Sequence, residues 1–73
     1  MQKIDFQLDS ESEYIELIGL LKNIGIAQTG GHAKMIVDEG SVFVNNIQES
    51  RKRYKVRSGD CILVNKTIEI SVK

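Results

Sequence analysis

The spacing of apolar residues changes partway along the chain, near Gly40. Between residues 14 and 37 apolar side chains recur every three or four positions, which is the period of a helix packed on a core. After residue 41 they alternate or form runs of about four, separated by short polar turns, as in strands. Residues 3–8 also alternate. This order predicts an α+β fold, with a two-helix hairpin packed on a small sheet of three to five short strands.

The first helix is expected over residues 11–24. Ser10 and Glu13 have the spacing of a capping box, in which each side chain accepts a hydrogen bond from a free backbone N–H of the other residue. Gly25 supplies the left-handed position that commonly ends a helix. The apolar stripe that faces the core consists of Leu17, Leu20, Leu21 and Ile24, joined by Tyr14 and Ile18.

The second helix is expected between Thr29, a suitable N-cap, and Gly40, a suitable end. Only a few residues separate the two helices, so they should pack as an αα-hairpin. The remaining chain predicts strands at 41–44, from 47, at 61–64 and at 67–72. Asn45–Asn46 between the first two is expected to be a tight turn, because Asn tolerates positive φ better than most residues.

The composition limits the classes of function. The 73 residues form one predicted domain, and a chain of this size buries only about 60% of its unfolded surface, which leaves little room for an enclosed active site. Cys61 and His32 stand alone, so we expect no disulfide, no metal and no cofactor. No catalytic constellation or nucleotide motif is present, and we predict that the protein is not an enzyme. With no apolar leader and no membrane span, a cytoplasmic monomer is expected.

The positive charge is concentrated in one segment, although the formal net charge of the chain is zero. Residues 1–49 carry three lysines against eight acidic residues. The segment "SRKRYKVR" (50–57) then carries five cations, at Arg51, Lys52, Arg53, Lys55 and Arg57. Such an asymmetry points to a charged partner.

An extended chain would place alternate residues of this segment on one face. Arg51, Arg53, Lys55 and Arg57 would then form a row of phosphate-binding cations, three of them with the planar fork of arginine. Val56 would anchor the opposite face in the core, with Tyr54 either beside it or stacked on a base. Two other interpretations stay open. The cations could protect an edge strand from aggregation, or they could pair with the acidic start of the first helix.

The stretch "TGGHAK" is a second candidate site. Free N–H groups at a helix start attract anions, and Gly30 and Gly31 have no side chains to block a phosphate from reaching them. His32 lies in the same turn, with Lys34 close behind it. Alternatively, the two glycines allow close packing of the hairpin, and His32 is an ordinary surface histidine.

Residues 16–46 resemble the S4 RNA-binding domain family. The shared pattern is a helix ending at Gly25, a second helix capped at Thr29, and a strand and turn reaching Asn45. "SGDCILV" resembles the family's later Gly-Asp turn and strand, so the resemblance spans about residues 14–64. The small size and the Arg-Lys-Arg run resemble the stand-alone bacterial proteins of the YbcJ-like group.

The resemblance implies that the two helices form the family's αL motif, whose surface holds structured RNA. It also implies RNA contacts at Thr29, Lys34 and the Asn45–Asn46 turn. Many S4 domains carry arginine at the positions of Glu16 and Gly30, and both cations are absent here. The basic run moves positive charge to the strand side of the same surface.

We therefore predict a translation- or ribosome-related module that binds rRNA or tRNA mainly through phosphate backbone and shape, with ribosome-associated proteins as further partners. The predicted RNA-binding residues are Thr29, Gly30, Gly31, His32, Lys34, Asn45, Asn46, Arg51, Lys52, Arg53, Lys55 and Arg57. The alternative is a protein–protein interaction adaptor that uses the basic strand or the acidic first helix.

Overall fold

The protein has the predicted α+β architecture in a computed structural model that describes all residues from 1 to 73. Its two helices are α1 (Leu17–Asn23) and α2 (Gly30–Asp38). The strands are β1 (Gln2–Phe6), β2 (Ile15–Glu16), β3 (Val42–Val44), β4 (Ile47–Gln48), β5 (Lys55–Val56), β6 (Cys61–Val64) and β7 (Ile68–Val72). Neither helix has the length and apolarity that a bilayer span requires.

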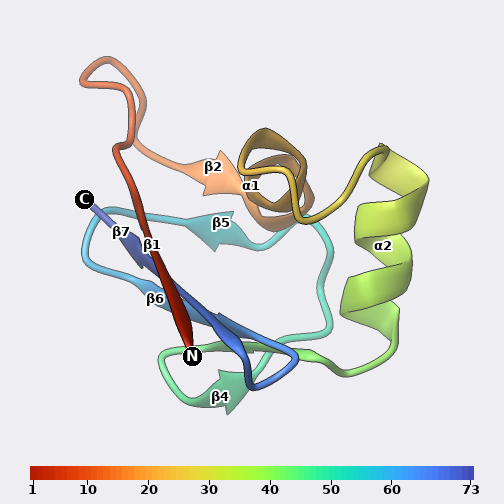
Figure 1. The fold of residues 1–73 in the computed structure, drawn as a ribbon. Helices are drawn as coiled ribbons and strands as arrows, with labels where there is room; N and C mark the ends of the chain where they lie inside the picture. The colour runs from red at the N-terminus through yellow and green to blue at the C-terminus, as the bar shows by residue number, and fades with distance from the viewer.

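Five strands form the main sheet, in the order β1-β7-β6-β3-β4 (Figure 1). The chain's two end strands, β1 and β7, are parallel neighbours, whereas the other pairs in this sheet are antiparallel. β2 and β5 form a separate two-stranded ribbon beside α1. The strand predictions for the C-terminal half are confirmed, including the alternation that buries Ile70 and Val72 on one face of β7.

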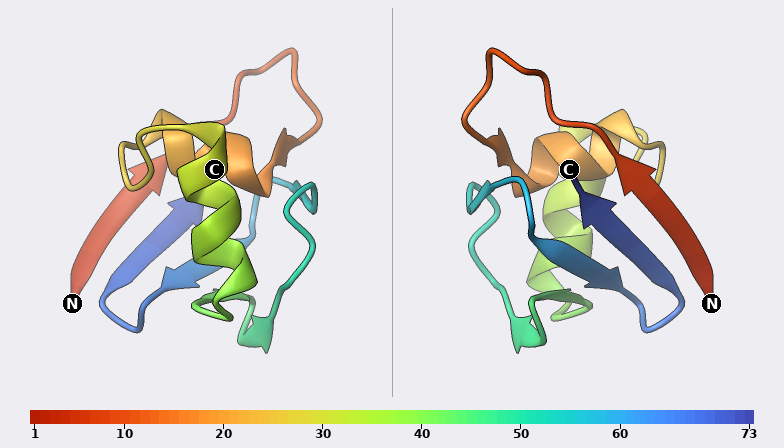
Figure 2. Two further views of the ribbon diagram at one scale, coloured as in Figure 1. Left: turned by 90° about the vertical axis from the view of Figure 1, so that its right-hand side faces the viewer. Right: turned by 90° about the vertical axis from the view of Figure 1, so that its left-hand side faces the viewer.

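The two helices form one layer on a face of the main sheet (Figure 2). The core between the layers is aliphatic, as the composition predicts, and it contains fifteen buried side chains. α1 contributes Leu17, Leu20 and Leu21, all fully buried, and α2 contributes Ala33 and Val37. Leu17, Leu20 and Leu21 of the predicted stripe are thus confirmed as core residues, whereas Tyr14, predicted to join them, precedes α1 and is exposed.

The turn predictions are also confirmed. Asn45 and Asn46 have φ values of 51° and 71°, as a tight hairpin with two left-handed residues requires. Gly25, after α1, has a φ of 85°. α2 begins as predicted, with the Thr29 hydroxyl accepting a hydrogen bond from the backbone N–H of His32 at 3.0 Å.

The predicted start of the first helix is wrong, since α1 begins at Leu17 rather than near residue 11. Ser10 and Glu13 make no capping box. Asp9 instead accepts hydrogen bonds from two residues of the loop that follows it, through its carbonyl from Ser12 and through its side chain from Glu11. Such local bonds compete with a helix. The chain then pairs with β5 as β2, and extended pairing and helix formation exclude each other in the same residues.

Candidate nucleic-acid interface

The basic run is a loop over most of its length, and the predicted single row of cations is wrong. The backbone makes a turn at residues 51–54, where the Tyr54 N–H donates to the Arg51 carbonyl at 3.1 Å. Only Lys55–Val56 is a strand. Val56 is fully buried and Tyr54 half-buried, so the anchoring role expected of them is confirmed. We call residues 49–54, which connect β4 to β5, the basic loop.

The basic loop turns because it supplies hydrogen-bond acceptors to α1. The first N–H groups of a helix have no partner within the helix. Glu16, at the N-cap position of α1, makes no side-chain cap. Instead, the N–H of Leu17 donates to the Tyr54 carbonyl at 2.9 Å, and that of Ile18 donates to the Lys52 carbonyl at 3.1 Å. In an extended run these two carbonyls would lie about 6.6 Å apart, whereas the turn brings them to the successive N–H groups of Leu17 and Ile18.

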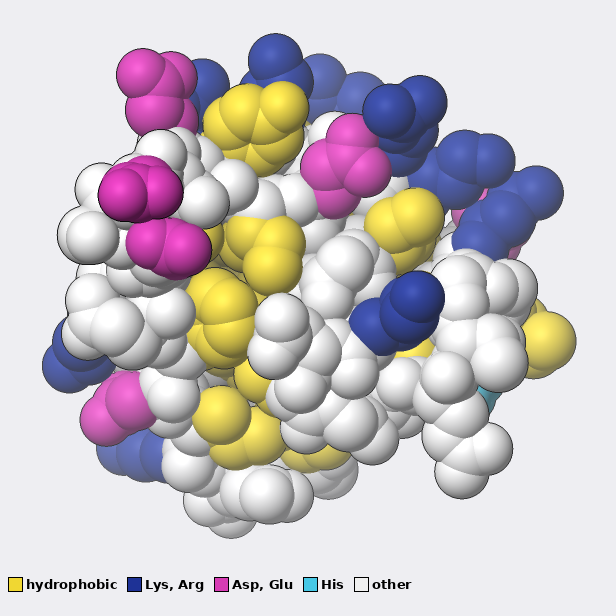
Figure 3. Space-filling model, turned by 90° about the horizontal axis from the view of Figure 1, so that it is seen from above, with side chains coloured by type: hydrophobic (Ala, Val, Ile, Leu, Met, Phe, Trp, Pro, Cys, Tyr) yellow, Lys and Arg dark blue, Asp and Glu magenta, His cyan; other side chains and the backbone are white.

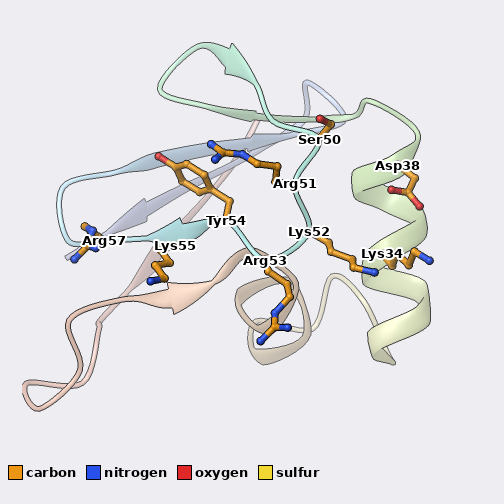
Figure 4. Close-up of a pocket in the computed structure, with 9 residues that line it drawn as sticks. All are labelled: Lys34, Asp38, Ser50, Arg51, Lys52, Arg53, Tyr54, Lys55 and Arg57. Carbon is orange, nitrogen blue, oxygen red and sulfur yellow. The ribbon is translucent and has the colours of Figure 1, made fainter.

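A groove of about 760 Å³ lies along this loop, beside α2 (Figure 4). From α2 it is lined by Lys34 and Asp38, which are four residues apart and therefore share one helix face. Lys52 extends from the basic loop toward α2 in Figure 4. The remaining lining residues are Ser50, Arg51, Arg53, Tyr54, Lys55 and Arg57.

The groove therefore gathers six of the predicted RNA-binding residues, all cationic, and its lining contains only one acidic residue, Asp38. In the view from above, a band of Lys and Arg side chains follows one edge of the molecule, with acidic side chains beside it (Figure 3). Because like charges repel, this cluster favours a ligand of opposite sign.

Two arginines of the basic loop have carboxylate partners within the protein. Arg51 donates to Glu49 twice, from Nε to Oε2 at 3.0 Å and from Nη2 to Oε1 at 3.2 Å. Arg53 Nε donates to Oε2 of Glu16 at 3.0 Å. The pairing of the run with the start of the first helix, left open by the sequence, is thus confirmed for Arg53. The alternative of cations that protect an edge strand is wrong for these two side chains, because they lie in a loop.

The two pairs differ in exposure. The Glu49 side chain is 11% exposed, whereas the Glu16 side chain is 35% exposed. The hydrogen bonds from Arg51 lower the pKa of the Glu49 carboxyl, and Glu49 in turn raises the pKa of the Arg51 guanidinium. The Arg51–Glu49 pair is therefore the more firmly held one.

The other groove cations have no carboxylate within ion-pair distance. They are Lys34, Lys52, Lys55 and Arg57. Lys55 and Arg57 lie over the ring of Tyr14, at 5.0 and 5.9 Å from its centroid. A cation–π contact leaves the positive charge unneutralised, so all four side chains remain available to an anion.

The start of α2 does not line the groove. Thr29 and His32 cap the helix, since the Nδ1 atom of His32 also accepts from the N–H of Gln28 at 3.3 Å. A side chain at Gly30 would meet no atom within 4 Å, and one at Gly31 would meet only the Thr29 hydroxyl, at 3.9 Å. Close packing therefore does not explain the two glycines. Gly30 precedes Lys34 by four residues and lies one turn earlier on the face that reaches the groove.

The Asn45–Asn46 turn also lies outside the groove lining. Asn45 has a structural role, because its side chain donates to Asp60 and accepts from the N–H of Cys61, both at 3.0 Å. It thereby fastens the β3–β4 turn to the start of β6. Asn46 is exposed and makes no side-chain hydrogen bond.

Comparison with known proteins identifies the family of this chain. The sequence model of the S4 domain matches residues 6–73. The chain belongs to the S4 domain family. Over 49 residues it is 39% identical to an Escherichia coli (strain K12) protein named "Putative RNA-binding protein YbcJ", a stretch that covers 67% of this chain and 70% of the relative. The Shigella flexneri "Uncharacterized protein YbcJ" matches to the same extent. The resemblance to the YbcJ-like group is confirmed.

Sequence reasoning missed three residues that shape the interface. Glu49 holds Arg51, Asp38 lines the groove, and Tyr14 lies under two cations. The role of Glu49 could have been predicted from the sequence, because a carboxylate two residues before an arginine can form a local ion pair with it. The cations over Tyr14 come from β5 and the residue that follows it, and no local pattern indicates that contact.

Proposed function

We propose that this chain binds structured RNA, namely ribosomal or transfer RNA, mainly through its phosphate backbone and shape. The observation that carries the proposal is the groove, which is lined by six cations and only one acidic residue. Basic side chains on a small open surface address phosphates and 2′-hydroxyls rather than base edges. Membership of the S4 domain family and the name of the Escherichia coli relative support the same ligand class.

The proposed contacts fall into three groups. The main one consists of the groove cations, and Lys34 and Lys52 are its centre because they come from different elements and have no carboxylate partner. The other two lie outside the groove lining, at the start of α2 and at the Asn45–Asn46 turn. Their residues proposed to contact RNA are Thr29, Gly30, Gly31, His32, Asn45 and Asn46.

The cellular role proposed is that of a bacterial, cytoplasmic, translation- or ribosome-related binding module. It acts as one S4-type domain and as a monomer, with ribosome-associated proteins as further partners. We infer no catalytic activity, since the groove holds cations and one carboxylate but no paired nucleophile and base.

The proposal is tested by salt titration of binding to ribosomal and transfer RNA. Lys52→Ala and Lys34→Ala should each weaken binding and lower the log–log salt slope by about 0.7–0.9, because each removes one phosphate contact. Lys3→Ala is the matched control, since Lys3 is exposed on β1 and does not line the groove. If all three variants behave alike, the groove is not the RNA site.

The absorbance of the purified protein provides a simpler test that can be made before the salt titration. The chain contains no tryptophan, so nucleic acid bound during purification would raise the ratio of absorbance at 260 and 280 nm visibly. Protein that is free of nucleic acid and that shifts neither ribosomal nor transfer RNA at low salt would contradict the proposed function. If such protein captured an acidic protein, the groove would be a protein-docking surface instead.

A further inference from the structure

Arg51 differs from the other groove cations because one edge of its guanidinium, Nε and Nη2, is already hydrogen-bonded to a buried carboxylate. Its Nε and Nη2 atoms both donate to the Glu49 carboxylate, and its backbone N–H donates to the same carboxylate at 2.9 Å. Glu49 is buried, so water competes little for these bonds. The Nε/Nη2 fork that arginine can offer to a phosphate is therefore engaged, and only the N–H groups at the Nη1 end stay free beside a negative charge.

One face of the Arg51 guanidinium is also covered. Its Cζ atom lies over the ring of Tyr54, 5.2 Å from the centroid. Tyr54 packs against the core and is only half-exposed, so the ring is a fixed support. The Arg51 side chain is nevertheless 74% exposed, and it lines the groove (Figure 4). The second face of the flat cation therefore remains accessible, together with its Nη1 edge.

A flat, oriented cation is suited to stacking. Unpaired RNA bases stack on arginine planes as they do on aromatic rings, and a cation–π contribution adds to the stacking. Glu49 and Tyr54 have already fixed the rotamer of Arg51, so little side-chain freedom is lost when a base arrives. A phosphate would gain less here, because it would lie close to the Glu49 carboxylate.

We propose that Arg51, held by Glu49 and Tyr54, is a stacking platform for one unpaired RNA base, beside phosphates bound by Lys34 and Lys52. This inference rests on the proposed function and sharpens the ligand class. The RNA is a structured one that presents a bulged or looped-out nucleotide at the groove. Arg53 provides a contrast, since no aromatic ring lies beneath its guanidinium and its carboxylate partner is more exposed.

The test uses a short RNA hairpin with one bulged 2-aminopurine, the same hairpin with an abasic bulge, and a fully paired hairpin. The wild-type protein should bind the bulged base about tenfold more tightly than the abasic site, and the 2-aminopurine fluorescence should change as the base leaves its neighbours in the RNA for the guanidinium. Arg51→Lys keeps the charge but loses the plane, so it should abolish both the preference and the fluorescence change while leaving the salt slope unchanged. Arg53→Lys, the matched control, should retain the preference.

The possible failures are distinguishable. If the wild type binds the bulged and abasic hairpins equally, the stacking platform is refuted while RNA binding stands. The platform is also refuted, again without affecting RNA binding, if Arg51→Lys folds normally and keeps the preference. If the wild type binds none of the three hairpins, nor ribosomal or transfer RNA, the platform and the proposed function are both wrong. The abasic comparison needs no variant, so it holds even if an Arg51 variant is unstable.

Discussion

The two helices begin in different ways. At the start of α2, Thr29 and His32 supply the caps, and every donor and acceptor lies between Gln28 and Ala33. At the start of α1 no side chain caps the helix, and its first N–H groups donate to carbonyls of the basic loop, far along the sequence. The start of α2 is therefore encoded locally, whereas that of α1 depends on a remote segment. That segment also carries the groove cations.

The largest expected effect comes from removing the anchor of the remote segment. Val56 is fully buried in β5 and pairs with Ile15 of β2. Val56→Ala should lower the free energy of unfolding by about 2–3 kcal/mol, through lost burial and a residual cavity. If β5 sets the start of α1, hydrogen exchange at the amides of Leu17 and Ile18 should also accelerate more than elsewhere in the helices.

Val72→Ala is the matched control, because Val72 is buried in β7 of the main sheet and takes no part in the β2–β5 ribbon. It should cost a similar free energy of unfolding without a selective effect on Leu17 and Ile18. Equal acceleration of exchange in both variants would show that the start of α1 does not depend on β5.

A smaller effect is expected when the carboxylate that holds the basic loop is neutralised. Glu49→Gln removes the negative charge and one of the two carboxylate oxygens that accept hydrogen bonds from Arg51, and it should cost about 1–2 kcal/mol at neutral pH. The pKa of Glu49 is lowered in the folded protein by the hydrogen bonds from Arg51. A carboxyl of this kind stabilises the fold above its unfolded pKa, and the contribution is lost as the pH falls through the folded value.

The difference between the wild type and Glu49→Gln should therefore shrink as the pH falls into the acidic range. Urea unfolding of both proteins at neutral and acidic pH measures it. A difference that stays constant across this range would mean that the charge of Glu49 does not hold the loop.

A substitution at the start of α2 should lower the free energy of unfolding by less than Val56→Ala or Glu49→Gln, and it should not affect the start of α1. Thr29→Ala removes the hydroxyl that accepts from His32 and should cost about 1 kcal/mol, whereas Thr29→Ser keeps the acceptor and most of the stability. Exchange at Leu17 and Ile18 should not accelerate beyond the global change. Selective acceleration there would contradict the separation of the two helix starts.

The same contrast explains how much of the fold the sequence predicts. Thr29, Gly25 and the Asn45–Asn46 turn are local signals, and each is used as predicted. The apolar stripe of α1 is correct, but its start is not. Ser10 and Glu13 satisfy a capping rule that considers only neighbours, and the pairing of Ile15 with Val56 overrides it. No local pattern could indicate that pairing.

The candidate site also has features that the sequence predicts and features that depend on tertiary contacts. The concentration of cations at 51–57 is visible in the sequence, and all of them line the groove with Lys34. The arrangement of these cations is not visible in the sequence. The segment turns instead of extending as a strand, and its carbonyls accept hydrogen bonds from the first N–H groups of α1. The groove also requires α2 beside the basic loop, which is a tertiary contact. Sequence therefore predicts the charge of the site, and tertiary structure determines its shape.

The smallest effect on stability is expected at the exposed pair that joins the two regions. Glu16, at the N-cap of α1, holds Arg53 of the basic loop, and both side chains are accessible. Exposed pairs contribute little, so Glu16→Gln should change the free energy of unfolding by less than about 0.5 kcal/mol. Because it removes a negative charge and releases Arg53, RNA binding should strengthen by up to about fivefold at low salt.

Asp5→Asn is the matched control for Glu16→Gln, since Asp5 is exposed in β1, 4.0 Å from Lys73, and does not line the groove. It removes the same charge from the protein, so a purely global electrostatic effect would strengthen RNA binding equally in both variants. A gain confined to Glu16→Gln would instead identify this carboxylate as a competitor of RNA for Arg53. A loss of stability well above the expected value would show that Glu16 supports the start of α1, which would narrow the contrast between the two helices.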